Sequence, residues 1–172
     1  MDFKSLIRTV PDFPIPGIQF RDITTMLKSP KGLNAAINKM SDFLQTVSFD
    51  SVIGPESRGF IFGVPLALNM EKGFIPARKA GKLPAQTVSK TYELEYGKNT
   101  IEIHRDAISP GQKLVIADDL LATGGTCKAI CELVQEVGAE IVAIVFFIEL
   151  SNLKGREELE KYCPVFSIVK YD

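Results

Sequence analysis

Eight apolar residues in succession, Ile141 to Ile148, limit the folds that are open to this chain. The run is far shorter than the roughly 20 residues with which a helix crosses a membrane. It suits a strand that is buried on both faces, and the segment KLVIA at 113–117 has the same character. Strands of this kind occur in parallel sheets that are covered by helices on both sides.

Helix-like and strand-like segments alternate along the rest of the chain. Apolar residues recur at helical spacing in three segments, and a more polar helix is expected in a fourth: 30–47, 59–70, 127–137 and 154–162. Short strands are predicted at 51–54, 73–78 and 164–169. The segments TYELEY and NTIEIH alternate in period two around Gly97-Lys98, which predicts a β-hairpin. We therefore expect an α/β fold, a mainly parallel twisted sheet with helices on both faces.

The 172 residues are expected to form one domain with two appendages. Pro11, Pro14 and Pro16 exclude a helix interior, so residues 1–28 are expected to form an N-terminal arm or hood. The polar segment 82–98 contains both glycine and proline and is expected to form a flexible β-hairpin lid.

Charged side chains nearly balance, with 20 Lys and Arg against 21 Asp and Glu, a formal net charge of −1. This balance argues against a protein that coats nucleic acid by neutralising its phosphates. The initial segment MDFKSLIRTVPDF has no cationic stretch followed by an apolar block, so we expect no secretory signal, no membrane attachment and a cytoplasmic location. Cys127, Cys131 and Cys163 lack the spacing of a zinc site and are expected to be buried as small apolar side chains.

The segment LVIADDLLATGGTCKA, residues 114–129, carries the clearest chemical signal in the sequence. The apolar strand is expected to stop at Asp118-Asp119, and a loop from Leu120 to Thr126 then leads into a helix. Unpaired backbone N–H groups and the helix dipole favour an anion at such a helix start, and Gly124-Gly125 lets the backbone approach it closely. The loop is therefore a candidate phosphate cradle.

The two carboxylates before the loop suit a sugar diol, because each can accept hydrogen bonds from hydroxyl groups. A phosphate cradle and a diol site a few residues apart describe a ribose 5-phosphate. The alternative is that Asp118-Asp119 caps the helix and TGGT is an ordinary turn. Neither a Walker A segment nor a GxGxxG segment is present, so a nucleoside triphosphatase or a dinucleotide dehydrogenase lacks its main support.

An apolar strand followed by DDLLATGGT resembles the phosphoribosyl-pyrophosphate motif of the type I phosphoribosyltransferases, most closely their adenine-specific branch. The resemblance continues in order along nearly the whole chain, in PDFPIPGIQFRDIT, ESRGFIFG, RKAGKLP, LEYG and ELSNLKGRE. It implies the fold of that family and transfer of a phosphoribosyl group from phosphoribosyl pyrophosphate to N9 of adenine, giving AMP and pyrophosphate.

The resemblance also implies roles for individual residues. Asp118 and Asp119 would bind the ribose hydroxyls. Five residues would hold the 5-phosphate: Ala122, Thr123, Gly124, Gly125 and Thr126. Six would contribute to the pyrophosphate site: Glu56, Ser57, Arg58, Arg78, Lys79 and Lys82. A non-proline cis peptide bond is expected between Glu56 and Ser57.

Further residues are implied for the base and for catalysis. Phe20 and Arg21 resemble the base pocket, with Phe20 as a stacking surface. Glu95 and Tyr96 in LEYG resemble the family's mobile loop, where Glu95 would take or orient the purine proton and Tyr96 would cover the ribose or pyrophosphate. Tyr96 could equally be an ordinary strand residue. Glu149, near the end of the long apolar run, has no assigned role.

Mg²⁺ is the expected cofactor, held mainly by substrate oxygens and water rather than by protein ligands. A homodimer is also implied, with subunits facing each other across residues 58–82. Ala122 stands where enzymes for 6-oxopurines usually carry an acidic residue, which is consistent with adenine. A transferase for another base and a non-catalytic sensor of phosphoribosyl pyrophosphate remain as alternatives.

Overall fold

The computed structural model describes residues 1–93 and 97–172. Seven strands form the main sheet in the order β5-β6-β4-β3-β7-β8-β9. Their bounds are Thr87–Glu93, Lys98–His104, Gly73–Lys79, Ser51–Pro55, Lys113–Leu121, Glu140–Leu150 and Val165–Tyr171, in that order. The pairs from β4 to β9 are parallel, whereas β6 runs antiparallel to both of its neighbours, β4 and β5. This confirms the mainly parallel α/β sheet.

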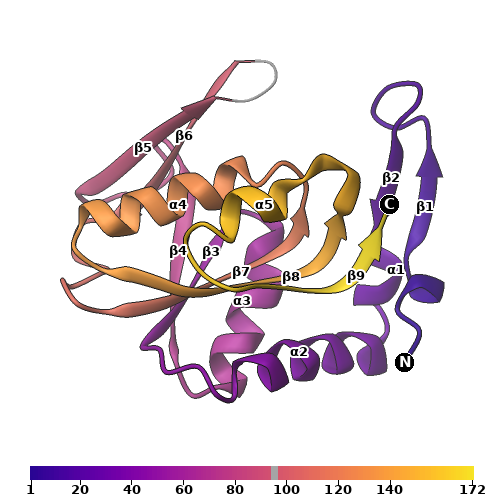
Figure 1. The fold of residues 1–172 in the computed structure, drawn as a ribbon, viewed down its shortest axis with the longest axis horizontal. Coiled ribbons are helices and arrows are strands. Elements are labelled where there is room, and N and C mark those ends of the chain that lie inside the picture. Colours follow the sequence, from indigo (N-terminus) through magenta and orange to yellow (C-terminus); the bar gives the residue numbers. More distant parts are fainter. Residues whose placement is uncertain (94–96) are drawn as a thin grey trace.

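Helices cover the sheet on both faces (Figure 1). α2 (Pro30–Leu44) and α3 (Arg58–Asn69) lie on one face, and α4 (Gly125–Glu136) and α5 (Gly155–Leu159) lie on the other. The central strands supply both cores because successive side chains point to opposite faces. In β7, Leu114 and Ile116 pack towards α4, while Val115 and Ala117 pack towards α2 and α3. The expectation of strands buried on both faces is therefore confirmed.

Some boundaries differ from the sequence-based expectation. α2 ends at Leu44 rather than at 47, and α5 covers only five residues of the expected 154–162. The larger difference is that β7 continues through Asp118 and Asp119 to Leu121, where a loop was expected from Leu120. Two charged residues can remain in this strand because it keeps its pairing with β8 up to Leu121 and because Asp119 has a cationic partner.

The N-terminal segment forms a separate two-stranded sheet. A 3-10 turn (Lys4–Leu6) precedes β1 (Arg8–Pro11), which pairs antiparallel with β2 (Gln19–Asp22), and the short α1 (Thr24–Leu27) follows. The guanidinium of Arg8 donates two hydrogen bonds to Asp22 across the pair. Phe13-Pro14 at the tip of this hairpin is cis. The hairpin stands beside the end of β9 (Figure 1), and its role as a hood stays a prediction.

The second appendage is the expected β-hairpin, and its strands extend the main sheet. β5 and β6 pair from Thr87↔His104 to Glu93↔Lys98, and β6 also pairs with the end of β4. Whether the hairpin moves as a lid stays a prediction.

All three cysteines are buried and free, as expected. Within the described residues, no helix combines the length and hydrophobicity that a membrane span needs.

Candidate active site

Part of the predicted site lies at the carboxyl ends of the neighbouring parallel strands β3, β4 and β7, the edge at which ligands bind in sheets of this kind. A cavity of about 320 Å³ lies there. Its lining combines residues from all three strand ends: Pro55, Glu56, Ser57, Arg58, Lys79, Asp118, Asp119, Leu120 and Thr126. The cavity brings the two carboxylates together with two of the predicted pyrophosphate cations.

The candidate phosphate cradle forms a second hollow, of about 100 Å³, which shares Asp118, Leu120 and Thr126 with the first. Its loop is shorter than expected, because β7 ends at Leu121 and α4 begins at Gly125. Gly124 precedes the helix with a φ of 81°, a left-handed conformation that glycine adopts without steric cost. All five predicted phosphate residues, 122–126, line this hollow. The backbone N–H groups at the start of a 12-residue helix thus face a hollow suited to an anion.

The two carboxylates differ in their partners. Asp119 is buried, and its Oδ2 lies 2.9 Å from Nε of Arg58, the first residue of α3. Oδ1 of Asp118 accepts a hydrogen bond of 2.8 Å from the backbone N–H of Asp119. Burial raises the pKa of Asp118 well above its usual range, and the neighbouring charge of Asp119 raises it further. Burial also raises the pKa of Asp119, but the Arg58 guanidinium opposes this effect.

The peptide bond between Glu56 and Ser57 is cis, as the resemblance implied. The Glu56 carboxylate accepts hydrogen bonds from Nε of Arg78 at 2.8 Å and from the backbone N–H of Lys79 at 2.9 Å. Burial raises the pKa of Glu56, but these two hydrogen bonds outweigh that effect and lower it overall. Glu56 therefore fixes the end of β4 beside the cis peptide bond.

The predicted pyrophosphate residues do not all reach the cavity. Arg58 and Lys79 line it. Arg78 is bound to Glu56 and donates a hydrogen bond from Nη1 to the backbone carbonyl of Lys82. The side chain of Lys82 is exposed and is not among the described residues that line the cavity.

The two predicted base-pocket residues also separate. The centre of the Phe20 ring lies 5.9 Å from the guanidinium of Arg58, which lines the cavity, and the ring packs edge-on against Phe13. The guanidinium of Arg21 instead lies 4.0 Å from the centre of the Tyr171 ring, and its Nη1 donates a hydrogen bond to Thr9. Alternation along β2 explains the difference, because adjacent side chains of a strand point to opposite sides.

Glu95 and Tyr96, expected to act in catalysis, lie outside the described residues. The neighbouring Tyr92 was not singled out, yet its hydroxyl lies 3.0 Å from Oγ1 of Thr126 in the first turn of α4. The period-two pattern of TYELEY placed Tyr92 on one face of a strand, and only the packing of β5 against α4 shows what this face contacts.

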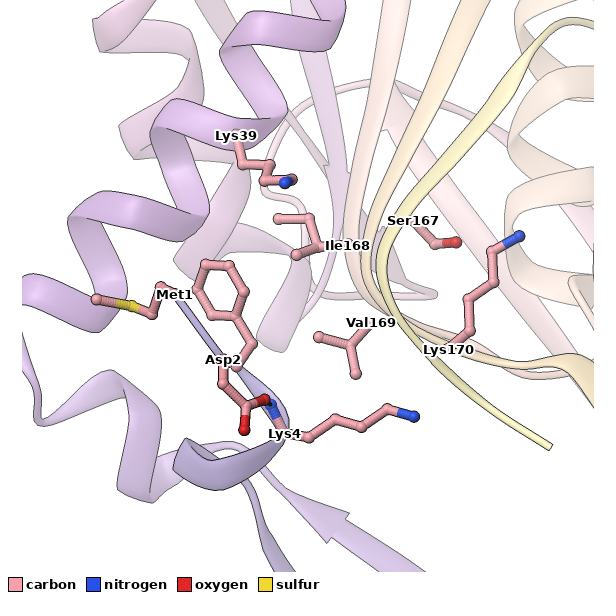
Figure 2. Close-up of a pocket in the computed structure, with 9 residues that line it drawn as sticks. Met1, Asp2, Lys4, Lys39, Ser167, Ile168, Val169 and Lys170 are labelled. Atoms are coloured by element: carbon pink, nitrogen blue, oxygen red, sulfur yellow. Dashed lines mark hydrogen bonds between the residues drawn. The ribbon is translucent and has the colours of Figure 1, made fainter.

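A larger hollow, of about 450 Å³, lies elsewhere, between the N-terminus, α2 and β9. Figure 2 shows Lys4, Lys39 and Lys170 around it, together with Asp2 and the side chains of β9. Among the described residues of its lining, none belongs to the predicted site. Volume alone therefore does not distinguish the candidate site, which is instead distinguished by its carboxylates, its cations and the N-terminus of α4.

Comparison with known proteins agrees with this geometry. Residues 22–171 match the family described as the phosphoribosyl transferase domain. The adenine phosphoribosyltransferase of Halothermothrix orenii is 56% identical over 170 residues, which cover 99% of each chain. The chain belongs to the adenine phosphoribosyltransferase family. This confirms the resemblance drawn from the DDLLATGGT segment and the motifs around it.

Solved structures of adenine phosphoribosyltransferases have the same fold. The enzyme from Thermoanaerobacter pseudethanolicus is 49% identical and superposes with a TM-score of 0.94, covering 98% of this chain and 97% of that one. The enzyme from Saccharomyces cerevisiae is 40% identical, with a TM-score of 0.88 and coverage of 95% and 94%. The yeast structure is a complex with adenine and an imino-altritol bisphosphate.

Proposed function

We propose that this protein transfers the 5-phosphoribosyl group of phosphoribosyl pyrophosphate to N9 of adenine, the reaction of purine salvage that yields AMP and pyrophosphate. The C1–O bond to pyrophosphate breaks, the C1–N9 bond forms, and N9 gives up its proton. The observation that carries this proposal is the junction of the phosphate cradle with the carboxylates and cations of the cavity, at residues 118–126 and 56–58.

Each part of the substrate has a matching part of the site. The helix start at Gly125 offers N–H groups to the 5-phosphate, and Asp118 and Asp119 offer acceptors to the ribose hydroxyls. Arg58 and Lys79, which line the same cavity as these carboxylates, offer positive charge to the pyrophosphate that leaves. Because negative charge grows on pyrophosphate as the bond breaks, cations placed there stabilise the transition state.

Adenine as the acceptor is supported by the named relatives and by the chemistry of the loop. Ala122 places no carboxylate where a 6-oxopurine enzyme would use one. Phe20, beside Arg58, would offer an aromatic ring against which a purine can pack. The proton of N9 needs an acceptor, and Glu95 stays our prediction for that role.

Mg²⁺ fits this donor set as a substrate-bound ion. Within residues 1–93 and 97–172, no three His, Cys, Asp or Glu side chains form a group that could hold a metal. Mg²⁺ takes oxygen ligands and keeps several of its waters, so the phosphate oxygens of the substrate can carry it into the cavity. Its positive charge would help to neutralise the leaving pyrophosphate, and Arg58 and Lys79 would position that group.

A pyrophosphate-release assay with each free base in turn tests the activity and the choice of base. The protein is incubated with phosphoribosyl pyrophosphate, Mg²⁺ and one free base, and release of pyrophosphate is measured. Adenine is expected to react, hypoxanthine and guanine to react at least about 100-fold more slowly, and excess EDTA to stop turnover. Faster reaction with a 6-oxopurine would favour the alternative transferase. Tight binding of phosphoribosyl pyrophosphate without turnover of any base would favour a sensor.

The cytoplasmic location of the protein stays a prediction.

A homodimer is also part of the proposal. α3 begins with Arg58 and exposes three apolar side chains at helical spacing: Ile61, Val64 and Leu68, with 36%, 40% and 74% of their surface accessible. A second copy of the chain on this face would bury the stripe and would sit beside the pyrophosphate side of the cavity. Exposed apolar stripes of this kind are typical of protein interfaces.

Leu68→Glu is expected to convert the dimer to a monomer, because it places a charge on the most exposed residue of the apolar stripe. Mass measurement by light scattering is expected to give about twice 18.9 kDa for the wild type and about 18.9 kDa for the variant. Leu153→Glu is the matched control, since Leu153 is also exposed, at 43%, but lies in a short 3-10 helix (Ser151–Leu153) after β8. A monomeric wild type, or a dimer that survives in Leu68→Glu, would contradict this interface.

A further inference from the structure

Gly155, the first residue of α5, packs against residues 122–124, which connect β7 to α4 and form the candidate phosphate loop. A Cβ atom at this position would overlap the carbonyl oxygen of Ala122 and would lie 2.8 Å from the carbonyl carbon of Thr123. In return, a Cβ at Gly124 would lie 3.1 Å from the carbonyl oxygen of Gly155. The two backbones are therefore in close contact. Gly155 does not have a positive φ, so the position requires glycine for space rather than for conformation.

α5 is too short to hold its own position, since an isolated helix of five residues is not stable in water. Arg156, the residue after Gly155, anchors it to the sheet. Nε and Nη2 of Arg156 donate hydrogen bonds of 2.9 and 2.5 Å to the two oxygens of Glu149 in β8. Its Nη1 donates to the backbone carbonyl of Val165 in β9, and its Nη2 also donates to Ser167.

Glu149 is 4% exposed, and a carboxylate buried to this degree requires the charge and hydrogen bonds that Arg156 provides. Paired planar groups fix distance and angle more tightly than a single hydrogen bond does. Leu159 adds a fully buried apolar contact one turn later and also faces Gly124. These contacts fix α5 to the sheet. At Gly155 the backbone of α5 contacts the backbone of the loop directly, without space for a side chain between them.

We propose that Gly155 and the Glu149–Arg156 ion pair are positioning residues for the 5-phosphate site. They support residues 122–124 without lining the hollow themselves. This support keeps the loop in the conformation in which the backbone at the start of α4 faces the hollow. None of the three residues lines that hollow. This inference rests on the proposed function, because it assumes that the hollow receives the 5-phosphate of the substrate and of AMP.

Gly155→Ala tests the inference, with Gly73→Ala as the matched control. Gly73 also has no positive φ, and a Cβ there would meet only Ser51 Oγ, at an ordinary 3.4 Å. Calorimetry is used to measure the affinity for AMP and for pyrophosphate with Mg²⁺. We expect Gly155→Ala to weaken AMP binding about 10- to 100-fold, because a displaced loop loses its aligned N–H groups. Pyrophosphate binding is expected to stay within about twofold, since its site is formed by other segments. Gly73→Ala is expected to change neither affinity.

Arg156→Lys provides a second variant in case Gly155→Ala does not fold. Lysine keeps the charge but cannot make the paired hydrogen bonds, so AMP affinity is again expected to fall while pyrophosphate affinity holds. Arg105→Lys, at an exposed arginine, is its control. Equal losses for both ligands, or unchanged AMP affinity in both variants, would overturn the positioning role. A wild type that binds no AMP would instead overturn the proposed function.

Discussion

Arg58→Ala is expected to lower kcat by about 100- to 1,000-fold, the loss found when one preorganised group that stabilises transition-state charge is removed. Arg58 combines two contacts that alanine cannot make. It lines the cavity beside Lys79, and its Nε lies 2.9 Å from the buried Asp119. Steady-state measurement of pyrophosphate release at saturating adenine and phosphoribosyl pyrophosphate gives the change directly.

The same variant is expected to alter the pH profile. Burial raises the pKa of Asp119 and the Arg58 guanidinium lowers it, so removal of Arg58 should move this pKa upward. The ionised carboxylate would then form only at higher pH, and the acidic limb of the kcat/KM profile should shift in that direction. Arg58→Lys should shift it less, and Arg105→Ala, at an exposed arginine, should not shift it. An unchanged kcat together with an unchanged acidic limb would exclude Arg58 from the site.

Asp118→Asn is expected to weaken binding of AMP about 10- to 100-fold, because a neutral amide replaces a charged acceptor of the ribose hydroxyls. It is also expected to stabilise the fold. Burial and the charge of Asp119 raise the pKa of Asp118, so ionised Asp118 disfavours folding. A group whose pKa is raised on folding contributes stability below its unfolded pKa and loses that contribution as pH rises through the folded pKa.

The gain in stability should therefore depend on pH. Asparagine stays neutral, and its side-chain oxygen can still accept the hydrogen bond from the N–H of Asp119. Thermal unfolding at several pH values is expected to show an increasing advantage of Asp118→Asn as the pH rises and little difference in acid. Each 1 kcal/mol would raise Tm by about 2–4 °C in a domain of this size. The control is Asp106→Asn at an exposed position. A variant with lower Tm at high pH, or with unchanged AMP affinity, would contradict this role.

Weaker AMP binding together with greater stability in Asp118→Asn would have a simple physical meaning. The binding site keeps two carboxylates close together in a buried strand, and their repulsion is balanced only in part by Arg58. A ribose diol would supply the missing hydrogen-bond donors. On this proposal the fold holds groups whose hydrogen bonds would be satisfied only when substrate binds, which is a common conflict between stability and function.

Local patterns in the sequence predicted most of the architecture. Apolar runs identified the strands that are buried on both faces, and the alternation around Gly97 identified the hairpin. The phosphate loop was also readable, because a helix start with glycines has its chemistry within a few consecutive residues. The end of β7 was misplaced, since charge normally ends a buried strand and the cation that allows Asp119 to stay comes from another part of the chain.

What the sequence by itself determined was therefore local: the order of strands and helices, the glycine-containing loop, and the family to which they belong. The tertiary structure alone decided which distant groups meet. Arg58 pairs with Asp119, Arg21 packs on Tyr171, Tyr92 contacts Thr126, and Gly155 supports the phosphate loop. Periodicity reports the direction in which a side chain points within its own element. Its partner across space depends on the order of strands in the sheet, which places segments far apart in the chain side by side.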